Sequence, residues 1–196
     1  MRYYQIGRLL SPPRRSARQT LDVTTDRLQG LTPGDWAVLG VVAEEPTHGF
    51  AVAQRLGPEG QLGRIWTLPR PVVYQVVKKL AQLELIAEQG TESGARGPVR
   101  TVFSATPAGR RALDRWLAEP VDHVRDVRSL LLLKLALLDR AGVDPGPLVA
   151  AQRERVNAQL GSLREERNQA AGFDRVVLDW RIASSAATVD FLRRYR

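Results

Sequence analysis

From residue 31 onward, apolar residues recur mostly at the spacing of amphipathic helices, whereas residues 1–30 show little sustained hydrophobic periodicity. Thr32-Pro33 is a typical helix start, because threonine is a favoured N-cap and proline is tolerated at the first helical position. Thr47 is expected to cap the next helix in the same way. The pattern predicts three successive helices, between Pro33 and Pro46, over residues 48–56, and from about Thr67 to Leu83.

A pair of short strands is expected after the third helix. A strand-like stretch begins at Ile86, and the segment 90–98 is rich in glycine and other turn formers. Residues 99–104 then alternate apolar and polar side chains, which is the pattern of a half-buried strand. Thr106-Pro107 opens one more helix over 108–117. The order helix, helix, helix, hairpin, helix over residues 31–118 predicts a winged helix-turn-helix domain, with the third helix as the recognition helix and the hairpin as the wing.

The rest of the chain, residues 119–196, reads as helical. Residues 130–138 are apolar on nearly every face, so this helix is expected to be buried on several sides. A charged helix follows over 152–169. The last segment spaces its apolar and small residues by alternating steps of four and three, a seam suited to packing against other helices: Phe173, Val177, Trp180, Ser184, Ala187 and Phe191. We therefore expect a mostly α fold, with a small β-hairpin wing and a helical C-terminal domain.

Composition narrows the range of functions. The 196-residue chain has a formal net charge of +8, no cysteine and two histidines. A strongly basic protein commonly meets a polyanion such as nucleic acid. The absence of cysteine excludes disulfides and thiolate chemistry, and two unlike histidines, His48 and His123, do not predict a metal site. We expect no cofactor. Residues 1–30 read as a basic, largely disordered arm with six arginines and two aspartates.

Basic residues gather in the two elements that would meet DNA. No acidic residue occurs between Gly60 and Leu83 or between Ser93 and Leu113. Lys and Arg on one face would neutralise phosphates and set the helix over the groove, and residues early in a recognition helix read base edges. The candidate DNA-binding residues are Arg64, Arg70, Tyr74, Gln75, Lys78, Lys79, Arg96 and Arg100.

Several motifs together resemble the PadR family of transcriptional regulators. His48-Gly49-Phe50 is similar to the His-Gly-Tyr feature of that family, with phenylalanine in place of tyrosine. Tyr74 followed by Leu80 and Leu83 resembles its recognition helix, although Arg70-Pro71-Val72 stands where small residues are more usual. Arg96-Gly97-Pro98 and the later Thr106-Pro107-Ala108-Gly109 resemble its wing and the start of the helix after it.

The resemblance implies a homodimeric repressor that binds a palindromic operator in double-stranded DNA and is relieved by a small hydrophobic or aromatic effector. It also implies that residues 119–196 form a helical dimerisation domain, beside a winged helix-turn-helix domain over residues 31–118. Trp116, Phe173 and Trp180 are candidates to line the effector pocket, and plain packing in the core or dimer interface is the competing interpretation. The matched His48 is expected to have a structural role, capping or packing the start of the second helix.

Other classes of protein fit the sequence less well. An enzyme is not expected, because nucleophilic catalysis needs a nucleophile beside an oriented base and no phosphate-binding glycine loop is present. A winged-helix adaptor that binds other proteins is the alternative, and it would not need the acid-free surface. No apolar run approaches the length of a membrane span. We expect a cytoplasmic protein without a membrane partner.

Overall fold

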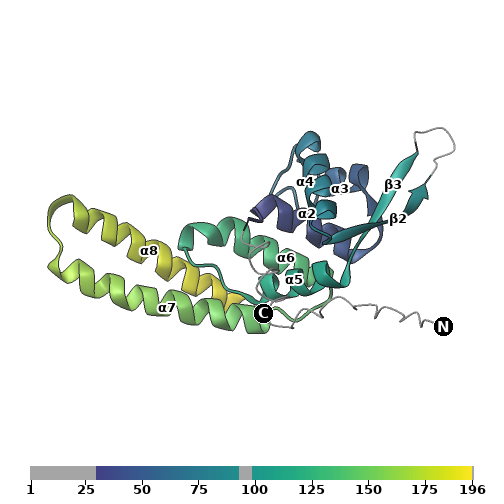
Figure 1. Cartoon of the computed structure of the whole chain (residues 1–196). Helices are drawn as coiled ribbons and strands as arrows, with labels where there is room; N and C mark the ends of the chain where they lie inside the picture. The colour runs from purple at the N-terminus through teal and green to yellow at the C-terminus, as the bar shows by residue number, and fades with distance from the viewer. Residues whose placement is uncertain (1–29, 93–98, 196) are drawn as a thin grey trace, which may run out of the picture. The chain divides into compact units, whose positions relative to one another are not determined.

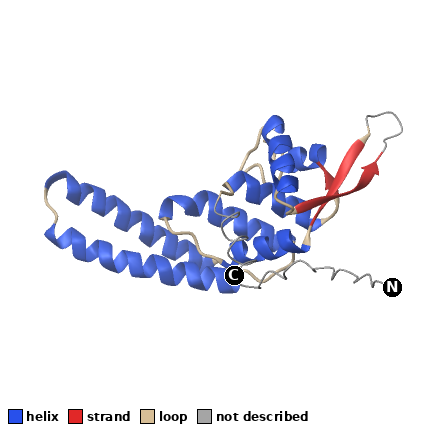
Figure 2. Cartoon of the chain, viewed as in Figure 1, coloured by secondary structure: helices blue, strands red, loops and turns tan. Residues whose placement is uncertain are grey.

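The computed structural model describes residues 30–92 and 99–195. The basic arm predicted for residues 1–30 and the candidate Arg96 lie outside these residues, apart from Gly30. The first helices are α2 (Pro33–Glu44), α3 (Gly49–Arg55) and α4 (Arg70–Gln82), followed by strands β2 (Ile86–Glu92) and β3 (Arg100–Ala105) and helix α5 (Pro107–Ala118) (Figure 1). This order confirms the winged helix-turn-helix, and the fold is mostly helical with one small sheet (Figure 2).

Helix α2 begins where the sequence predicts and forms the centre of the domain. The Thr32 hydroxyl accepts the backbone N–H of Asp35, while the Asp35 carboxylate accepts the backbone N–H of Thr32 at 2.6 Å. This reciprocal capping satisfies two amides that have no partner within the helix. Nine residues in a row, Gly34 to Val42, are buried, and α2 packs against α4, α5 and α6.

Two helix starts differ from the sequence prediction. His48, rather than Thr47, caps α3, and residues Thr47–His48 form a short strand, β1, that pairs with β3. Helix α4 begins at Arg70 rather than near Thr67, with Pro69 as its N-cap residue. Leu68 precedes Pro69, and the proline ring pushes the preceding residue away from helical conformations. The Thr67 hydroxyl instead donates to the Gly63 carbonyl at 2.6 Å.

The sheet has three antiparallel strands in the order β1-β3-β2. Strand β2 extends to Glu92, so pairing continues three residues into the segment predicted as a loop. The register shifts between Glu88 and Gly90, and Gly90 has a φ of 148°, a conformation that L side chains rarely adopt.

The start of α5 explains the Thr-Pro-x-Gly motif. The Thr106 hydroxyl accepts the Gly109 amide at 3.0 Å and donates to the Glu84 carbonyl at 2.8 Å. A Cβ at Gly109 would lie 2.0 Å from the Leu85 carbonyl oxygen, so only glycine permits this approach of helix to chain. The motif therefore fastens α5 to the turn between α4 and β2.

The C-terminal region is helical, as predicted. A 3-10 turn, η1 (Val124–Asp126), and a π-helical turn, η2 (Val127–Leu131), lead into α6 (Leu132–Arg140). Four leucines of α6 are buried together with Lys134, which bears out the expectation of a helix buried on several sides. Helices α7 (Gly146–Gln169) and α8 (Gly172–Arg194) lie side by side as an antiparallel pair. No helix in the described part of the chain is long and apolar enough to cross a membrane.

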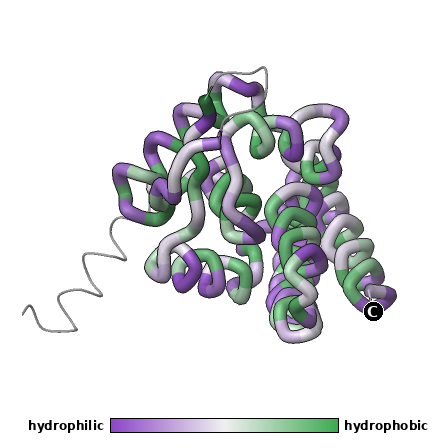
Figure 3. Tube along the Cα trace, turned by 90° about the vertical axis from the view of Figure 1, so that its right-hand side faces the viewer, coloured by the Kyte–Doolittle hydropathy of each residue, from purple (hydrophilic) through white to green (hydrophobic). Residues whose placement is uncertain are grey.

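The apolar seam predicted on α8 is not buried within the chain. The side of α8 that is buried within the chain carries Leu178, Ser185, Val189 and Leu192. Phe173 is 77% exposed and Trp180 is 73% exposed. Hydrophobic positions recur along α8, the helix that ends at the C label in Figure 3. Helix α8 thus has two apolar sides. One packs within the chain, and the predicted seam with its period of 3.5 residues lies on the other.

Candidate nucleic-acid interface

Helix α4 separates its apolar and polar residues onto two faces. Val73, Val76, Val77 and Leu80 are buried. The opposite face is exposed and carries four of the candidate DNA-binding residues, Arg70, Tyr74, Gln75 and Lys78. Three of these follow one another at steps of four residues, so they lie along one side of the helix. The predicted recognition helix therefore presents one basic and polar surface.

Lys79 does not belong to that surface. Its Nζ donates to Oδ2 of Asp35 at 2.7 Å, and the Asp35 side chain is 2% exposed. Asp35 also caps α2, so the ion pair fastens α4 to the start of α2. The stretch 60–83 has no acidic residue in sequence, but the fold brings one to it from α2. Lys79 thus differs in role from its neighbour Lys78, for which no ion pair is found in the described residues.

Tyr74 lies against the first residue of α3. A Cβ on Gly49 would be 2.8 Å from Cε1 of the Tyr74 ring, so the glycine leaves room for the ring. The tyrosine is nevertheless 48% exposed. One side of the ring is therefore held by α3 while the other remains accessible.

The wing and the recognition helix meet at Phe50. The guanidinium carbons of Arg70 in α4 and Arg100 in β3 each lie 4.7 Å from the centroid of the Phe50 ring. Aromatic rings attract cations at this distance through their negative face. Arg100 Nη1 also lies 3.3 Å from Nε2 of His48. His48 caps α3, as the sequence predicts for a structural role, by accepting the Ala51 amide at Nδ1.

The remaining basic candidate, Arg64, lies apart from α4. It lines a cavity of about 1560 Å³ together with residues from the linker after α5 and from helices α7 and α8. Trp66, which follows it in the segment between α3 and α4, lines the same cavity. Its indole Nε1 is buried and finds no hydrogen-bond acceptor among the described residues. Sequence reasoning missed Trp66, since it lies in a segment without a helical or strand period.

The three effector-pocket candidates are not brought together. Trp180 lines the cavity, whereas Trp116 and Phe173 do not. Trp116 stacks on Trp36, with ring centroids 5.1 Å apart and ring planes 7° apart, and Lys134 Nζ lies 4.6 Å from its ring centroid. Trp116 therefore serves the packing role given as the competing interpretation. Phe173 is exposed near the start of α8.

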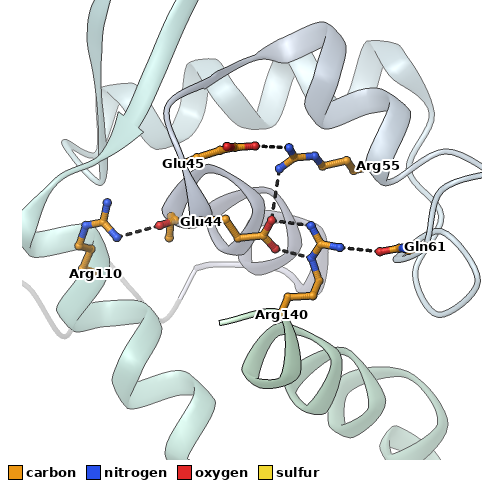
Figure 4. A network of polar contacts seen from close by, with 7 residues as sticks. Glu44, Glu45, Arg55, Gln61, Arg110 and Arg140 are labelled. Carbon is orange, nitrogen blue, oxygen red and sulfur yellow. Dashed lines mark hydrogen bonds and ion pairs between the residues drawn. The ribbon is translucent and has the colours of Figure 1, made fainter. Parts of the chain in front are cut away.

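A polar network joins α6 to the helix-turn-helix (Figure 4). Arg140 donates through Nε and Nη2 to the two carboxylate oxygens of Glu44, at 2.5 and 2.6 Å, and through Nη1 to Gln61 at 2.6 Å. Arg55 donates to Glu44 at 3.2 Å and also pairs with Glu45. The hydrogen bond to Glu44 raises the pKa of Arg140. The network fastens the last turn of α6 to α2 and to the segments around α3.

Burial also affects one lysine of α6. Lys134 is 3% exposed, and its Nζ donates to the backbone carbonyl of Glu119 at 2.5 Å. Burial lowers the pKa of Lys134 to about 8, against the opposite effect of the Glu119 and Asp122 carboxylates. Within residues 30–92 and 99–195, no group of three or more histidine, cysteine or acidic side chains could hold a metal ion.

An amphipathic third helix, a two-stranded wing and basic residues on both are the features of a winged helix-turn-helix domain. Residues 38–115 match the family model described as "Transcriptional regulator PadR-like family". This segment is therefore similar to the PadR-like transcriptional regulators, the family that the motifs resemble.

Individual relatives are distant. The chain is 25% identical over 135 residues to "Probable transcriptional regulator Rv1176c" of Mycobacterium tuberculosis. The aligned segment spans 67% of each protein. Among solved structures, it is similar to Bacillus subtilis PadR in complex with operator DNA, with 18% identity, 81% of this chain and 94% of that chain covered, and a TM-score of 0.43. A structure of the same B. subtilis protein with p-coumaric acid gives 18% identity, 81% and 90% coverage and a TM-score of 0.37. The similarity to the family rests on residues 38–115.

Proposed function

We propose that this protein is a sequence-specific DNA-binding repressor that acts in the cytoplasm as a homodimer. The observation that carries the proposal is the exposed face of α4, where Arg70, Tyr74, Gln75 and Lys78 lie along one side of the helix. In helix-turn-helix proteins the second helix enters the major groove, and its first residues contact base edges. Arg70 is the first residue of α4, so we assign it a base contact. We assign Lys78 to a phosphate, since it lies two turns further along.

Arg100 extends this surface to the wing. Arg100 and Arg70 both contact the Phe50 ring, so the two arginines lie close together although they come from different elements. We therefore expect β3 to lie along the DNA backbone beside the groove that receives α4. Arg96, in the loop between the strands, would add a further phosphate or minor-groove contact.

The homodimer proposal rests on the second apolar side of α8. Phe173, Val176 and Trp180 are more than half exposed, while the other side of the helix packs within the chain. Large apolar side chains that are exposed next to one another mark interaction sites. The seam spacing predicted from the sequence suits packing against a second copy of the same helix. Residues 119–196 would then form the dimerisation domain beside the DNA-binding domain of residues 31–118, and two copies of α4 would reach half-sites about one helical turn apart.

An effector site is proposed in the cavity that Arg64, Trp66 and Trp180 line. Two tryptophans offer flat apolar surface to an aromatic compound, and the unpaired indole N–H of Trp66 would donate to one acceptor on it. A ligand that binds one arrangement of the domains better than another would shift the population of the DNA-bound form. This is how a small hydrophobic or aromatic molecule would relieve repression.

The experiment is a fluorescence anisotropy titration of the full chain against DNA from its own upstream region, at several salt concentrations and with scrambled competitor. We expect preference for the upstream DNA and a linear fall of log affinity with log salt, because bound Lys and Arg release counterions. Arg70→Ala should remove the preference. Lys78→Ala should weaken binding to all sequences alike and lower the salt slope by about two, because each protomer of the dimer loses one phosphate contact.

Arg153→Ala is the matched control, since it removes the same charge from an exposed position on α7. Affinity equal to that of the Arg153→Ala protein in both interface variants would contradict the proposed surface. Absence of binding even at low salt would overturn the DNA-binding proposal and leave the protein-binding adaptor as the better hypothesis.

A further inference from the structure

The two ring nitrogens of His48 have different surroundings. Nδ1 lies 3.1 Å from the backbone nitrogen of Ala51 and accepts its N–H. A backbone amide can only donate, so Nδ1 must carry a lone pair rather than a proton. A neutral imidazole that is unprotonated at Nδ1 carries its proton at Nε2. Capping of α3 therefore makes His48 a donor at Nε2.

That donor faces another donor. Nε2 of His48 and Nη1 of Arg100 are 3.3 Å apart. A guanidinium group has five N–H donors and no acceptor, so this contact is not a hydrogen bond between the two side chains. In the described part of the chain, no carboxylate pairs with Arg100 or lies at Nε2 of His48. Two neighbouring N–H groups thus face each other with no acceptor between them among the described residues.

The Phe50 ring brings a second arginine, Arg70, next to His48 and Arg100. The ring lies 4.7 Å from the guanidinium carbons of Arg70 and Arg100, and 6.2 Å from the His48 ring. His48, Phe50 and Arg100 are each half-buried, which limits how far water screens the charges. A group that accepts several hydrogen bonds and carries negative charge would satisfy this cluster, and a phosphate oxygen has both properties.

We propose that His48 Nε2 and Arg100 together bind a phosphate of the DNA backbone, so that His48 is a DNA-binding residue as well as a helix cap. The proposal rests on the proposed function and deepens it. Helix α3 is the first helix of the helix-turn-helix, and in such motifs the first helix crosses the DNA backbone. His48 at its start is therefore placed for a phosphodiester rather than for a base edge. His48 would then cap α3 and, through its phosphate contact, help to fix the position of the protein along the DNA.

Two substitutions at His48 separate capping from binding. In His48→Asn the amide oxygen replaces Nδ1 as the cap acceptor, because asparagine is a favoured N-cap residue, but the Nε2 donor is lost. In His48→Gln the longer amide places a donor nearer to the position of Nε2, while the cap acceptor is displaced. We expect His48→Asn to unfold near the wild-type temperature and to bind DNA about tenfold more weakly for each half-site, the size expected for one hydrogen bond to a charged group.

The order of the two variants is the decisive result. We expect His48→Gln to unfold at a lower temperature than His48→Asn and yet to bind DNA more tightly. A purely structural role predicts the reverse, with the better capped His48→Asn as the stronger binder. The same anisotropy titration as above serves for both variants. Wild-type affinity in His48→Asn would overturn the proposal.

Nitrogen-15 NMR of the imidazole rings tests the site without requiring a specific operator. The chain has two histidines, so the His48→Asn spectrum assigns both. We expect His48 to show the Nε2–H tautomer, and its Nε2 signal to shift when inorganic phosphate or a non-cognate duplex is added. The Nδ1–H tautomer, or no shift with either probe, would overturn the phosphate site. If the shift occurs with phosphate but the wild-type protein has no preference for its upstream DNA, the site stands and the proposed specific regulator fails.

Discussion

The Nζ atom of Lys79 lies 2.7 Å from Oδ2 of Asp35, a carboxylate 44 residues earlier in the chain that is almost fully buried and also caps α2. The two consecutive lysines of α4 therefore have different roles. One stabilises the domain from within, and the other faces outward with Arg70 and Tyr74.

We predict that Lys79→Gln mainly lowers stability, whereas Lys78→Gln mainly weakens DNA binding. Lys79→Gln leaves the buried Asp35 carboxylate without its cation and should lower the free energy of unfolding by about 1–2 kcal/mol, because an unpaired buried charge is costly. Lys78→Gln should change stability by less than about 0.5 kcal/mol, as is usual at exposed positions. Urea denaturation and DNA titration of both proteins measure the two properties. Equal losses of stability would show that the Lys79 ion pair contributes nothing.

Gly49→Ala should weaken DNA binding more than it affects stability. The added Cβ would lie 2.8 Å from the Tyr74 ring, which is half exposed and can move outward. The displaced tyrosine would then disturb the face of α4. Gly161→Ala is the control, since a Cβ there has open space, and it should stabilise α7 by roughly 0.5–1 kcal/mol without affecting DNA binding. Unchanged DNA affinity in Gly49→Ala would contradict a DNA contact by Tyr74.

Lys134 should make the protein more stable as the pH rises from about 8 to 10.5. The folded chain holds the Lys134 proton up to a pKa of about 8, whereas the ordinary value is 10.5. Between these values the unfolded chain binds more protons, so raising the pH favours the folded state. Relative to Lys134→Met, the wild-type protein should gain up to about 3 kcal/mol across this window. Chemical denaturation at pH 7, 9 and 10.5 measures the difference, and a constant difference between the two proteins would refute the prediction.

Phe173→Glu/Val176→Glu should produce monomers. These side chains are exposed at the start of α8 and do not line the cavity, so charge there should disrupt a dimer without altering the proposed effector site. Loss of the second DNA-binding domain should reduce affinity for a two-half-site operator on the order of 100-fold, because the second contact is no longer intramolecular. Light scattering coupled to size-exclusion chromatography gives the mass. A wild-type protein that elutes as a monomer at micromolar concentration would rule out this dimer.

Much of the domain could be predicted because its signals are local. Thr32-Pro33 and Thr106-Pro107 start α2 and α5 in the structure as in the prediction, since a cap and the fixed φ of proline act within one turn. The valine stripe of α4 likewise determines which side is buried, because the period of 3.6 residues relates each side chain to its neighbours on the helix. The exposed positions of Arg70, Tyr74 and Lys78 follow from that period alone.

Tertiary structure decided everything that depends on residues far apart in the chain. The pairing of Lys79 with Asp35, the meeting of Arg70 and Arg100 at Phe50, and the stacking of Trp116 on Trp36 each join different elements. Helical spacing relates a residue to its own helix and carries no information about which partner lies across from it. For the same reason the sequence identified an apolar seam on α8, while only the packing of α7 against the other side of that helix left Phe173 and Trp180 exposed.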